Sequence, residues 1–400
     1  MKIVQINATC GIGSTGKICV GISKLLTSND VENYILCSES NGYDLGIVCS
    51  NKWEIKFQAL KSRIFGNYGF TSTVITKRLI RKLDEISPDI VHIHNIHGHN
   101  VQLDRLFSYL KKRNVKVYYT FHDCWAFTGY CPHFVMAKCD KWKTGCGKCV
   151  LSKKYSWFFD RSASNYRRKA EALKGLDMTI ITPSDWLGGL VKQSFLKDYP
   201  VKVINNGINL DIFRPVDSDF RKKHGLENKK IVLGVSFGWS INKGIDVFIE
   251  LAKRLPDEYR IVLVGTNDET DKMLPKNIIT IHRTNNQNEL AEIYTAADVF
   301  VIPTREENYP TVNMEALACG TPVLTFRTGG SPEIIDETCG VVVDCDNIDA
   351  MERKIIWICE EEPYSKEACI KKAQEFDQNE RFKEYVDLYE RIVASGTEGN

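Results

Sequence analysis

The chain has 400 residues, of which 43% are hydrophobic and 26% are charged. This composition excludes a disordered or fibrous chain, and the length predicts at least two domains. Lysine and arginine together number 53 and aspartate and glutamate 51, so the net charge indicates no polyanionic partner. The sequence has no apolar run of about 18 residues that would cross a membrane. Its first residues lack the layout of a secretory signal, so we expect a cytoplasmic protein.

The first half of the chain alternates predicted strands with predicted helices. Apolar strands are expected at Lys2–Asn7, Asn33–Cys37, Ile90–His94, Val115–Phe121, Met178–Thr182 and Val201–Ile204. Helical patterns lie between them, for example over Lys17–Leu26 and Leu103–Lys112. Apolar strands that alternate with helices indicate a parallel sheet covered on both faces.

A second alternation follows the turn residues Asn205-Asn206-Gly207. Its strands are expected at Lys230–Val235, Arg260–Val264, Ile278–Ile281, Val299–Ile302, Pro322–Thr325 and Gly340–Val343. Its helices are expected at Ile245–Leu255, Glu289–Ala296, Val312–Ala318, Ala350–Cys359 and Ser365–Glu375. We therefore predict an α/β protein with two doubly wound parallel sheets, in domains 1–212 and 213–378. A C-terminal helix in segment 379–400 is expected to pack back on the first domain. Ligands of such sheets bind at the carboxyl ends of the strands, so we expect the site in a cleft between the domains.

The segment ENYPTVNMEALACGTPVLTFRTGGSPE, over Glu307–Glu333, carries the clearest chemistry. Glu307 and Glu315 are separated by seven residues, and Glu315 is predicted to open a helix. The N-terminus of a helix attracts phosphate groups, and a carboxylate beside it accepts hydrogen bonds from ribose or sugar hydroxyls. Taken alone, this spacing also fits an ordinary helix with two solvated glutamates.

These residues resemble the donor-site signature of family 4 retaining glycosyltransferases. Further segments follow in the family's order: GIGSTGK, PDIVHIHNIHGH, TFHDCWAF, ITPSDWL, VINNGIN, INKGID and ELAEIYTAADVFVIPT. The resemblance covers nearly the whole chain and implies the GT-B architecture, in which two Rossmann-like domains face each other across a cleft. The stretches HDCWAFTGYCPHF and CDKWKTGCGKC resemble a subgroup that acts in capsular, exopolysaccharide or colanic-acid-type assembly.

The resemblance also implies roles for particular residues. Glu315 would hold the ribose, Glu307 would bind hydroxyls of the transferred sugar, and Lys243 would neutralise the diphosphate as it leaves. His122 would stabilise charge near the donor sugar. Backbone N–H groups of the segment Asn308, Tyr309, Thr311 and Val312 would support the phosphates. The glycines Gly11, Gly13 and Gly16 would let the first domain approach donor and acceptor.

The activity implied is transfer of a hexose, with retention of configuration, from a UDP- or GDP-sugar to an oligosaccharide or polyprenyl-linked acceptor. No cofactor is implied for catalysis and no nucleic-acid partner is expected. Two departures from the family pattern stand out. Gly238 and Phe237 occupy positions where the family has an arginine, so either the diphosphate is held by one cation fewer or another arginine substitutes, with Arg305 and Arg283 as the candidates. Pro310 donates no N–H to the ligand.

Alternative functions explain less of the sequence. Gly11, Gly13 and Gly16 after a strand, with Glu39 near the end of the next strand, also match the fingerprint of an NAD(P)-dependent oxidoreductase. That interpretation leaves Lys243 and the two glutamates of the donor signature unexplained. A non-enzymatic membrane or nucleic-acid binding protein would ignore these motifs altogether.

Histidines and cysteines raise the question of metals. The histidines His92, His94, His97 and His99 are expected to have structural or acceptor-side roles rather than to bind a metal. The fourteen cysteines are more typical of thiols or metal ligands than of disulfides. Four of them lie in or beside an insertion at about 124–150, with His133 as an alternative ligand: Cys131, Cys139, Cys146 and Cys149. They permit a structural zinc ion, or they are free thiols in a loop packed by Trp125 and Trp142.

Two stretches combine basic and aromatic residues, 52–82 and 138–169. Trp53, Phe57, Leu60 and Ile64 recur at near-helical spacing among the lysines of the first, and Trp157, Phe158 and Phe159 lie within the second. One interpretation is contact with the anionic inner face of a membrane, where a polyprenyl-linked acceptor would sit. The other is a solvated basic face whose apolar side belongs to the domain core. The sequence leaves both open.

Overall fold

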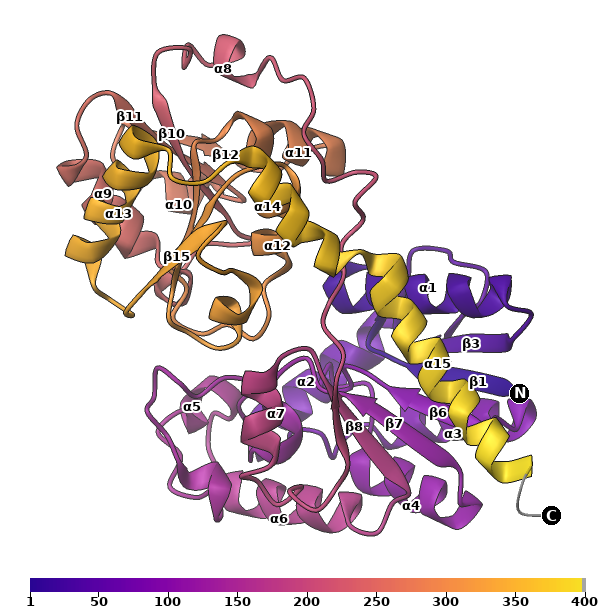
Figure 1. Ribbon diagram of the computed structural model, residues 1–400. Helices are drawn as coiled ribbons and strands as arrows, with labels where there is room; N and C mark the ends of the chain where they lie inside the picture. Colours follow the sequence, from indigo (N-terminus) through magenta and orange to yellow (C-terminus); the bar gives the residue numbers. More distant parts are fainter. Residues whose placement is uncertain (398–400) are drawn as a thin grey trace. The chain divides into compact units, whose positions relative to one another are not determined.

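The computed structural model describes residues 1–397, with side chains through Arg391, and its contacts divide the chain into two units (Figure 1). Unit 1 joins Met1–Asn205 to the C-terminal segment that begins at Asn379, and unit 2 is Asn206–Gln378. The domain boundary that we predicted after residue 212 lies a few residues further along the chain. The last three residues of the predicted segment 379–400 lie outside the described residues.

Unit 1 is built on a seven-stranded parallel sheet of order β5-β3-β1-β6-β7-β8-β9. Its strands are β1 (Lys2–Ile6), β3 (Glu32–Cys37), β5 (Gly46–Val48), β6 (Ile90–Ile93), β7 (Lys116–Thr120), β8 (Met178–Thr182) and β9 (Val201–Val203), and a small separate pair is formed by β2 (Thr9–Cys10) and β4 (Glu39–Ser40). The chain runs outward from β1 to β5, returns to the middle of the sheet, and runs outward again from β6. The order therefore reverses between β1 and β6.

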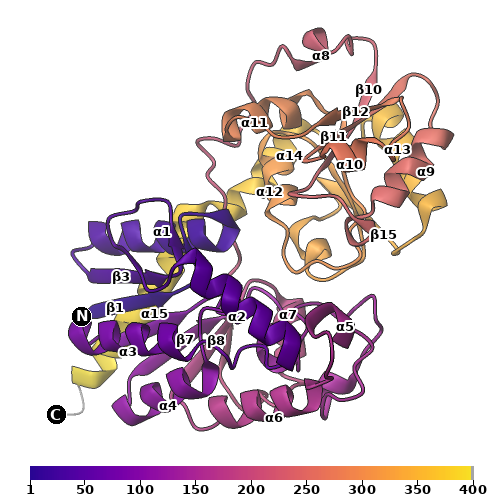
Figure 2. The same ribbon diagram turned by 180° about the vertical axis from the view of Figure 1, so that it is seen from behind.

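Helices cover both faces of this sheet (Figures 1 and 2). They are α1 (Gly13–Ser28), α2 (Lys52–Phe65), α3 (Thr73–Ile86), α4 (Leu103–Arg113), α5 (Ser152–Tyr155), α6 (Ser162–Leu173), α7 (Asp185–Val191) and α15 (Gln378–Thr397), with short 3-10 turns η1 (Trp125–Phe127) and η2 (Lys141–Lys143). Because side chains alternate along a strand, Ile3 packs into the cluster that includes α1 and α15, and Val4 packs into the cluster that includes α3 and α4.

Helix α15 packs on the sheet of unit 1. Phe382, Tyr385 and Tyr389 are buried in one cluster with Ile3 and other residues of the sheet. Tyr118, on β7, donates a hydrogen bond from its hydroxyl to the carbonyl of Leu388 at 3.0 Å. Burial of these aromatic rings stabilises the C-terminal helix on the first unit.

Unit 2 contains a six-stranded parallel sheet of order β12-β11-β10-β13-β14-β15. Its strands are β10 (Lys230–Val235), β11 (Tyr259–Val264), β12 (Ile278–Ile281), β13 (Val299–Ile302), β14 (Val323–Phe326) and β15 (Gly340–Val343). Its helices are α8 (Phe220–Lys223), α9 (Ile245–Arg254), α10 (Asp268–Asp271), α11 (Gln287–Ala296), α12 (Thr311–Ala318), α13 (Ile348–Glu361) and α14 (Lys366–Ala373), with turns η3 (Ile241–Lys243), η4 (Ser331–Ile334) and η5 (Gln374–Phe376). Here the strand order reverses between β10 and β13.

The predicted alternation of strands and helices is confirmed in both units, with differences at element ends. The structure adds the edge strand β5, which is only three residues long and therefore has too little pattern to be recognised. Helix α1 begins at Gly13 rather than at Lys17, so the glycine-rich segment itself forms the first helical turn. No helix in the described part of the chain has the length and apolar character needed to cross a membrane.

Candidate functional site

The strand order of unit 2 points to one place on its sheet. The strand order reverses between the adjacent strands β10 and β13, and doubly wound sheets bind ligands at the carboxyl ends of the strands where the order reverses. The loop after β10 carries Lys243, and the loop after β13 carries Glu307. The topology therefore brings together two residues that the sequence motifs had selected separately.

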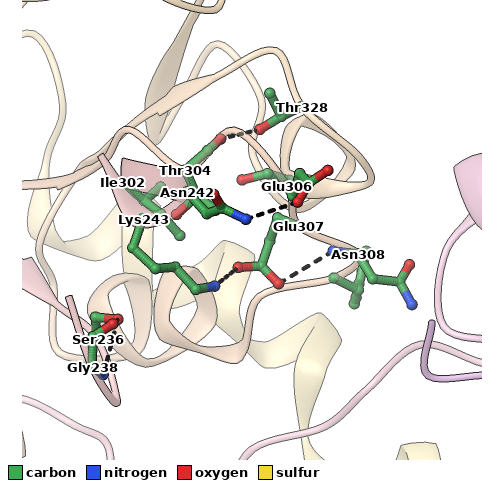
Figure 3. A network of polar contacts seen from close by, with 12 residues as sticks. Ser236, Gly238, Asn242, Lys243, Ile302, Thr304, Glu306, Glu307, Asn308 and Thr328 are labelled. Atoms are coloured by element: carbon green, nitrogen blue, oxygen red, sulfur yellow. Dashed lines mark hydrogen bonds and ion pairs between the residues drawn. The ribbon is translucent and has the colours of Figure 1, made fainter. Parts of the chain in front are cut away.

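Lys243 and Glu307 form an ion pair at this point (Figure 3). The Lys243 Nζ atom lies 2.8 Å from Glu307 Oε2, and both side chains are partly exposed. Next to the lysine, Gly244 has a φ of 74°, and a Cβ atom there would lie 2.3 Å from the carbonyl oxygen of Pro303. Only glycine lets the loop after β10 approach the loop after β13 this closely.

The backbone around Glu307 is held by further hydrogen bonds. Glu307 Oε1 accepts from the N–H of Asn308 at 3.2 Å, and the carbonyl of Asn308 accepts from the N–H of Gly330 at 2.7 Å. Asn242 Nδ2 donates to Glu306 Oε2 at 2.9 Å (Figure 3). These contacts orient the Glu307 carboxylate, and they engage the N–H of Asn308 that we expected to support a phosphate.

The remaining donor-segment residues lie on or just before α12. Pro310, with a φ of −75°, caps this helix, and the helix begins at Thr311. The expectation that Glu315 opens the helix is therefore wrong, because Glu315 lies in the second turn. Thr311 and Val312 form the first turn, where N–H groups have no acceptor within the helix.

Glu315 and Tyr309 have different surroundings. Glu315 Oε2 accepts a hydrogen bond at 3.1 Å from the hydroxyl of Tyr294, a buried residue of α11. Burial and the nearby Glu315 carboxylate raise the pKa of Tyr294 well above its ordinary value, so this hydroxyl remains a donor. Tyr309 is buried and packs against Phe376, with 6.4 Å between ring centroids, so its side chain belongs to the core.

The two arginines that we predicted as candidates for a second phosphate cation have different surroundings. Arg305 donates to both carboxylate oxygens of Asp246 at 2.8 and 2.7 Å, and to Asp346 at 2.7 Å. Its charge is therefore already neutralised by two carboxylates. Arg283 follows β12, the edge strand two places from β10. Arg305 also donates to the carbonyl of Ile241, in the turn that carries Lys243, at 2.5 Å. It therefore lies beside the loop of Lys243, and a substitute cation at Arg305 or Arg283 stays a prediction.

In unit 1 the corresponding reversal lies between β1 and β6. The glycine-rich loop follows β1, and its Gly13 has a φ of 67° with no atom within 4 Å of an added Cβ. The backbone at Gly13 is therefore accessible to a ligand, whereas Gly11 and Gly16 pack against the side chains of Asn41 and Thr9. The histidine-rich segment follows β6, and His122 follows β7. Asn7 Oδ1 accepts from the N–H of Asn95 at 3.0 Å and ties the first loop to the second.

The histidines of unit 1 form a hydrogen-bonded group. His122 Nε2 lies 3.2 Å from His94 Nδ1, and His94 Nε2 lies 3.1 Å from Gln5 Oε1. His92, which is fully buried, contacts the hydroxyls of Tyr389 and Thr120 at 2.5 and 2.8 Å. Burial lowers the pKa of His122 to about 4. His122 is therefore neutral at pH 7, so it can exchange hydrogen bonds with a ligand but cannot supply a positive charge.

These buried histidines predict that acid destabilises unit 1. Burial lowers the pKa of His92 to about 3 and that of His94 well below its ordinary value. The ordinary pKa is about 6.5, so between pH 6.5 and the folded-state values the unfolded chain binds more protons, and stability falls as the pH falls. At pH 5 the cost is about 2 kcal/mol for His92, and His94 adds to it in the same direction. Urea unfolding of unit 1 at pH 7.5 and pH 5 measures this loss.

His92→Gln provides the comparison for this prediction. The variant should lose about 2 kcal/mol less than the wild type between the two pH values, because one titrating group is gone. His224→Gln, at an exposed position of unit 2, should leave the loss unchanged. An unfolding free energy that is the same at pH 7.5 and pH 5 would contradict the prediction.

One pair of polar residues was not identified from the sequence. His97 Nε2 lies 2.8 Å from Asp123 Oδ2, and Tyr68 OH lies 3.3 Å from His97 Nδ1. Burial opposes ionisation of Asp123, but His97 and the N–H of Trp125 outweigh it and lower the pKa of Asp123 to about 2. The pair lines a small pocket with His94 and His122 at the carboxyl ends of β6 and β7. The signal was present, since Asp123 directly follows His122.

The four cysteines of the insertion are free thiols in this structure, and the structural zinc ion stays a prediction. Among residues 1–397, no three histidine, cysteine, aspartate or glutamate side chains are grouped so that they could hold a metal ion. Burial raises the pKa of Cys131 to about 12 and that of Cys146 to about 11, which favours neutral thiols. The insertion is packed instead by Trp142, whose ring lies 5.3 Å from that of Phe127 and 5.0 Å from that of Phe134.

The fold and the two reversal points define a protein with two parallel-sheet α/β domains and a polar group of loops at each switch point. The sequence matches the family model described as Glycosyltransferase Family 4 over residues 19–212 and the one described as Glycosyl transferases group 1 over residues 216–376. The chain belongs to this family of glycosyltransferases and has the GT-B fold class that we predicted. The NAD(P) alternative has no support in these matches.

Individual relatives are distant in sequence. The chain is 28% identical over 215 residues to N,N'-diacetylbacillosaminyl-diphospho-undecaprenol alpha-1,3-N-acetylgalactosaminyltransferase of Campylobacter jejuni, an alignment that covers 50% of this chain and 57% of that protein. It is 22% identical to WcaC of Escherichia coli, named as a colanic acid biosynthesis glycosyl transferase, over 73% of this chain and 71% of that one. HepE of Anabaena, solved with UDP-glucose, has a TM-score of 0.68 at 15% identity and covers 97% of this chain and 99% of its own.

Proposed function

We propose that this glycosyltransferase retains configuration and moves a hexose from a nucleotide-diphosphate sugar to a lipid-linked acceptor in the assembly of a surface polysaccharide. The observation that carries the proposal is the ion pair of Lys243 and Glu307 at the switch point of unit 2. One cation and one carboxylate, side by side on opposing loops, match a ligand that carries both a diphosphate and a sugar.

Each site residue then has a distinct task. Lys243 contacts the diphosphate and stabilises the negative charge that grows on it as the sugar departs. Glu307 accepts hydrogen bonds from hydroxyls of the sugar, and Glu315 accepts from the ribose. The first turn of α12, at Thr311 and Val312, supplies N–H groups to the phosphates. His122 acts on the sugar as a neutral hydrogen-bonding group.

The reaction that we propose is attack of the acceptor on the same face that the leaving group departs from. The bond between the anomeric carbon and the phosphate oxygen breaks, a bond to the acceptor hydroxyl oxygen forms, and the acceptor proton passes to the departing phosphate oxygen. Lys243 lowers the cost of this step because it stands beside the oxygen atoms that gain charge. No protein nucleophile is needed.

The relatives support the finer parts of the proposal. The name of the Campylobacter protein describes a lipid diphosphate acceptor, WcaC is named for the biosynthesis of colanic acid, and HepE was solved with UDP-glucose. We extend these properties to this chain as a hypothesis: a UDP- or GDP-hexose donor, a polyprenyl-linked oligosaccharide acceptor, and action on the cytoplasmic side of a membrane.

A thermal shift experiment tests the donor assignment. Saturating UDP or GDP should raise the melting temperature of the protein, since a ligand at about 100 times its Kd stabilises the folded state by about 2.7 kcal/mol. NAD and NADP are the matched controls and should leave it unchanged. The nucleotide that raises the melting temperature identifies the donors to assay next. Its sugar derivatives, UDP-sugars or GDP-sugars, are then offered to the enzyme, and the released nucleotide is measured. Stabilisation by NAD(P) and by neither UDP nor GDP would contradict the proposal.

A further inference from the structure

Helix α2 buries polar side chains and exposes large apolar ones, whereas an ordinary surface helix does the reverse. Its buried side chains are the polar Gln58 and Ser62. Its apolar residues Trp53, Phe57 and Leu60, at i, i+4 and i+7, share the opposite face and are 79%, 60% and 45% exposed. A helix on a soluble domain normally buries its apolar stripe, so the core interpretation of these residues is wrong for α2.

A second exposed apolar segment lies against the end of α2. Val150, Trp157, Phe158 and Phe159 are all exposed, with Val150 at 74% and Phe158 at 68%. The N–H of Trp157 donates to the carbonyl of Arg63 at 2.7 Å, and Arg63 Nη1 donates to the carbonyl of Lys154 at 2.5 Å. These hydrogen bonds join α2 and residues 148–161 into one surface, which we call the docking surface. Figure 2 shows α2 along the outside of unit 1.

Basic side chains surround the apolar residues of the docking surface. In α2 and residues 148–161 eight lysines and arginines stand against Glu54 and Asp160: Lys52, Lys56, Lys61, Arg63, Lys148, Lys153, Lys154 and Arg161. Glu54 is bound by Arg78, with oxygen to nitrogen distances of 2.7 Å. Asp160 accepts from the N–H groups of Cys149 and Ser162 at 2.7 and 2.9 Å. Lys56 lies over the Trp53 ring, 5.0 Å from its centroid. The positive charge is therefore in excess around the exposed rings.

The neighbouring helix α3 shows that this arrangement is particular to the docking surface. It belongs to the same basic stretch 52–82, but it buries Ile75, Leu79 and Leu83 in the core of unit 1 and exposes Lys77 and Arg81. The solvated-face interpretation therefore holds for α3. The basic stretch 52–82 therefore contains one helix with a buried apolar face, α3, and one with an exposed apolar face, α2.

We propose that the docking surface binds an anionic lipid bilayer. Exposed tryptophan and phenylalanine residues ringed by lysines suit the interface of a membrane, where the rings enter the acyl boundary and the ammonium groups meet lipid phosphates. An exposed apolar face of this extent marks an interaction site, and its positive rim selects an anionic surface. The partner is therefore a lipid bilayer rather than another protein surface.

The docking surface is continuous with the polar pocket at the carboxyl ends of β6 and β7. Tyr155, within residues 148–161, stacks on Tyr68 with 6.0 Å between ring centroids. The Tyr68 hydroxyl in turn contacts His97 of the His97–Asp123 pair at 3.3 Å. A carrier lipid in the bilayer would therefore present its headgroup sugar beside this pocket. That last step rests on the proposed function, whereas bilayer binding does not.

Vesicle sedimentation tests the proposal on the full chain. The wild type should pellet with phosphatidylglycerol vesicles and much less with phosphatidylcholine vesicles, and rising salt should weaken pelleting because it screens the lysines. Combining Trp53→Ser, Phe57→Ser and Leu60→Ser should lower the affinity for phosphatidylglycerol at least about tenfold. Lys56→Glu with Lys61→Glu should have a similar effect.

Matched controls come from α3. Val74→Ser removes an apolar side chain that is 54% exposed, and Lys77→Glu with Arg81→Glu reverses two exposed charges. Both should bind phosphatidylglycerol as the wild type does. Phe158→Ser, on the second segment, gives an independent test if the triple variant fails to fold. UDP should stabilise all variants equally, so a failure of bilayer binding is distinguishable from a failure of the donor assignment.

Three results would overturn the proposal. One is wild-type protein that pellets equally with both vesicles or with neither. Another is a folded triple variant that binds phosphatidylglycerol as the wild type does. The last is a wild-type dimer in solution that the triple variant converts to a monomer, since the surface would then serve a second copy of the chain.

Discussion

Replacing Lys243 with methionine is expected to lower kcat/KM for the nucleotide sugar by about 100- to 1,000-fold, the cost of removing one preorganised group from a developing charge. The variant keeps the aliphatic stem and removes the ammonium group, which lies 2.8 Å from Glu307. Because the diphosphate is present in both substrate and product, UDP or GDP should also bind more weakly. Steady-state rates of nucleotide release and titration calorimetry measure the two effects.

Lys253→Met is the matched control for this prediction. Lys253 lies on α9, ten residues after Lys243, and pairs with Glu250 on the exposed face of that helix. Its replacement should change kcat/KM less than about twofold, since exposed ion pairs contribute little. Near-wild-type transfer and nucleotide affinity in Lys243→Met would refute the assignment of the lysine to the diphosphate.

Replacing Glu307 with glutamine is expected to lower kcat by about 100-fold while leaving the affinity for UDP or GDP nearly unchanged. The amide has the same shape but no charge, and it accepts weaker hydrogen bonds from sugar hydroxyls than a carboxylate. The nucleotide carries no sugar, so it does not need this group. Measuring both kcat and nucleotide affinity therefore separates the two roles, because loss of Lys243 should lower both quantities and loss of the Glu307 charge should lower only kcat.

Glu250→Gln is the control and should leave kcat nearly unchanged, because its carboxylate pairs with Lys253 and Arg254 on the exposed face of α9. The double variant with Lys243→Met and Glu307→Gln should lose less activity than the two single losses multiplied, since the residues contact each other. A Glu307→Gln variant that loses nucleotide binding and retains transfer at saturating donor would contradict the assignment to the sugar.

Much of the fold could be predicted because its strands are short apolar runs between turn residues. Met178–Thr182 and Val299–Ile302 are strands at the predicted bounds, since burial on both faces of a parallel sheet demands uninterrupted apolar residues. The donor segment was recognisable because Glu307 and Glu315 lie within one stretch of chain. The sequence also showed that Gly238 stands where the family has an arginine. It did not show that Arg305 pairs with Asp246 and Asp346, because these contacts depend on the folded loops.

The sequence by itself determined the strand and helix alternation, the glycosyltransferase motifs and the residue types of the donor site, because these are local patterns along the chain. The tertiary structure alone decided which distant groups meet. Lys243 pairs with Glu307 because β10 and β13 are neighbours at the reversal of the sheet. His97 pairs with Asp123, and the rings of Trp53 and Phe57 on α2 are exposed. Helical spacing places Trp53 and Phe57 on one face, but only the packing of the rest of unit 1 determines whether that face is covered.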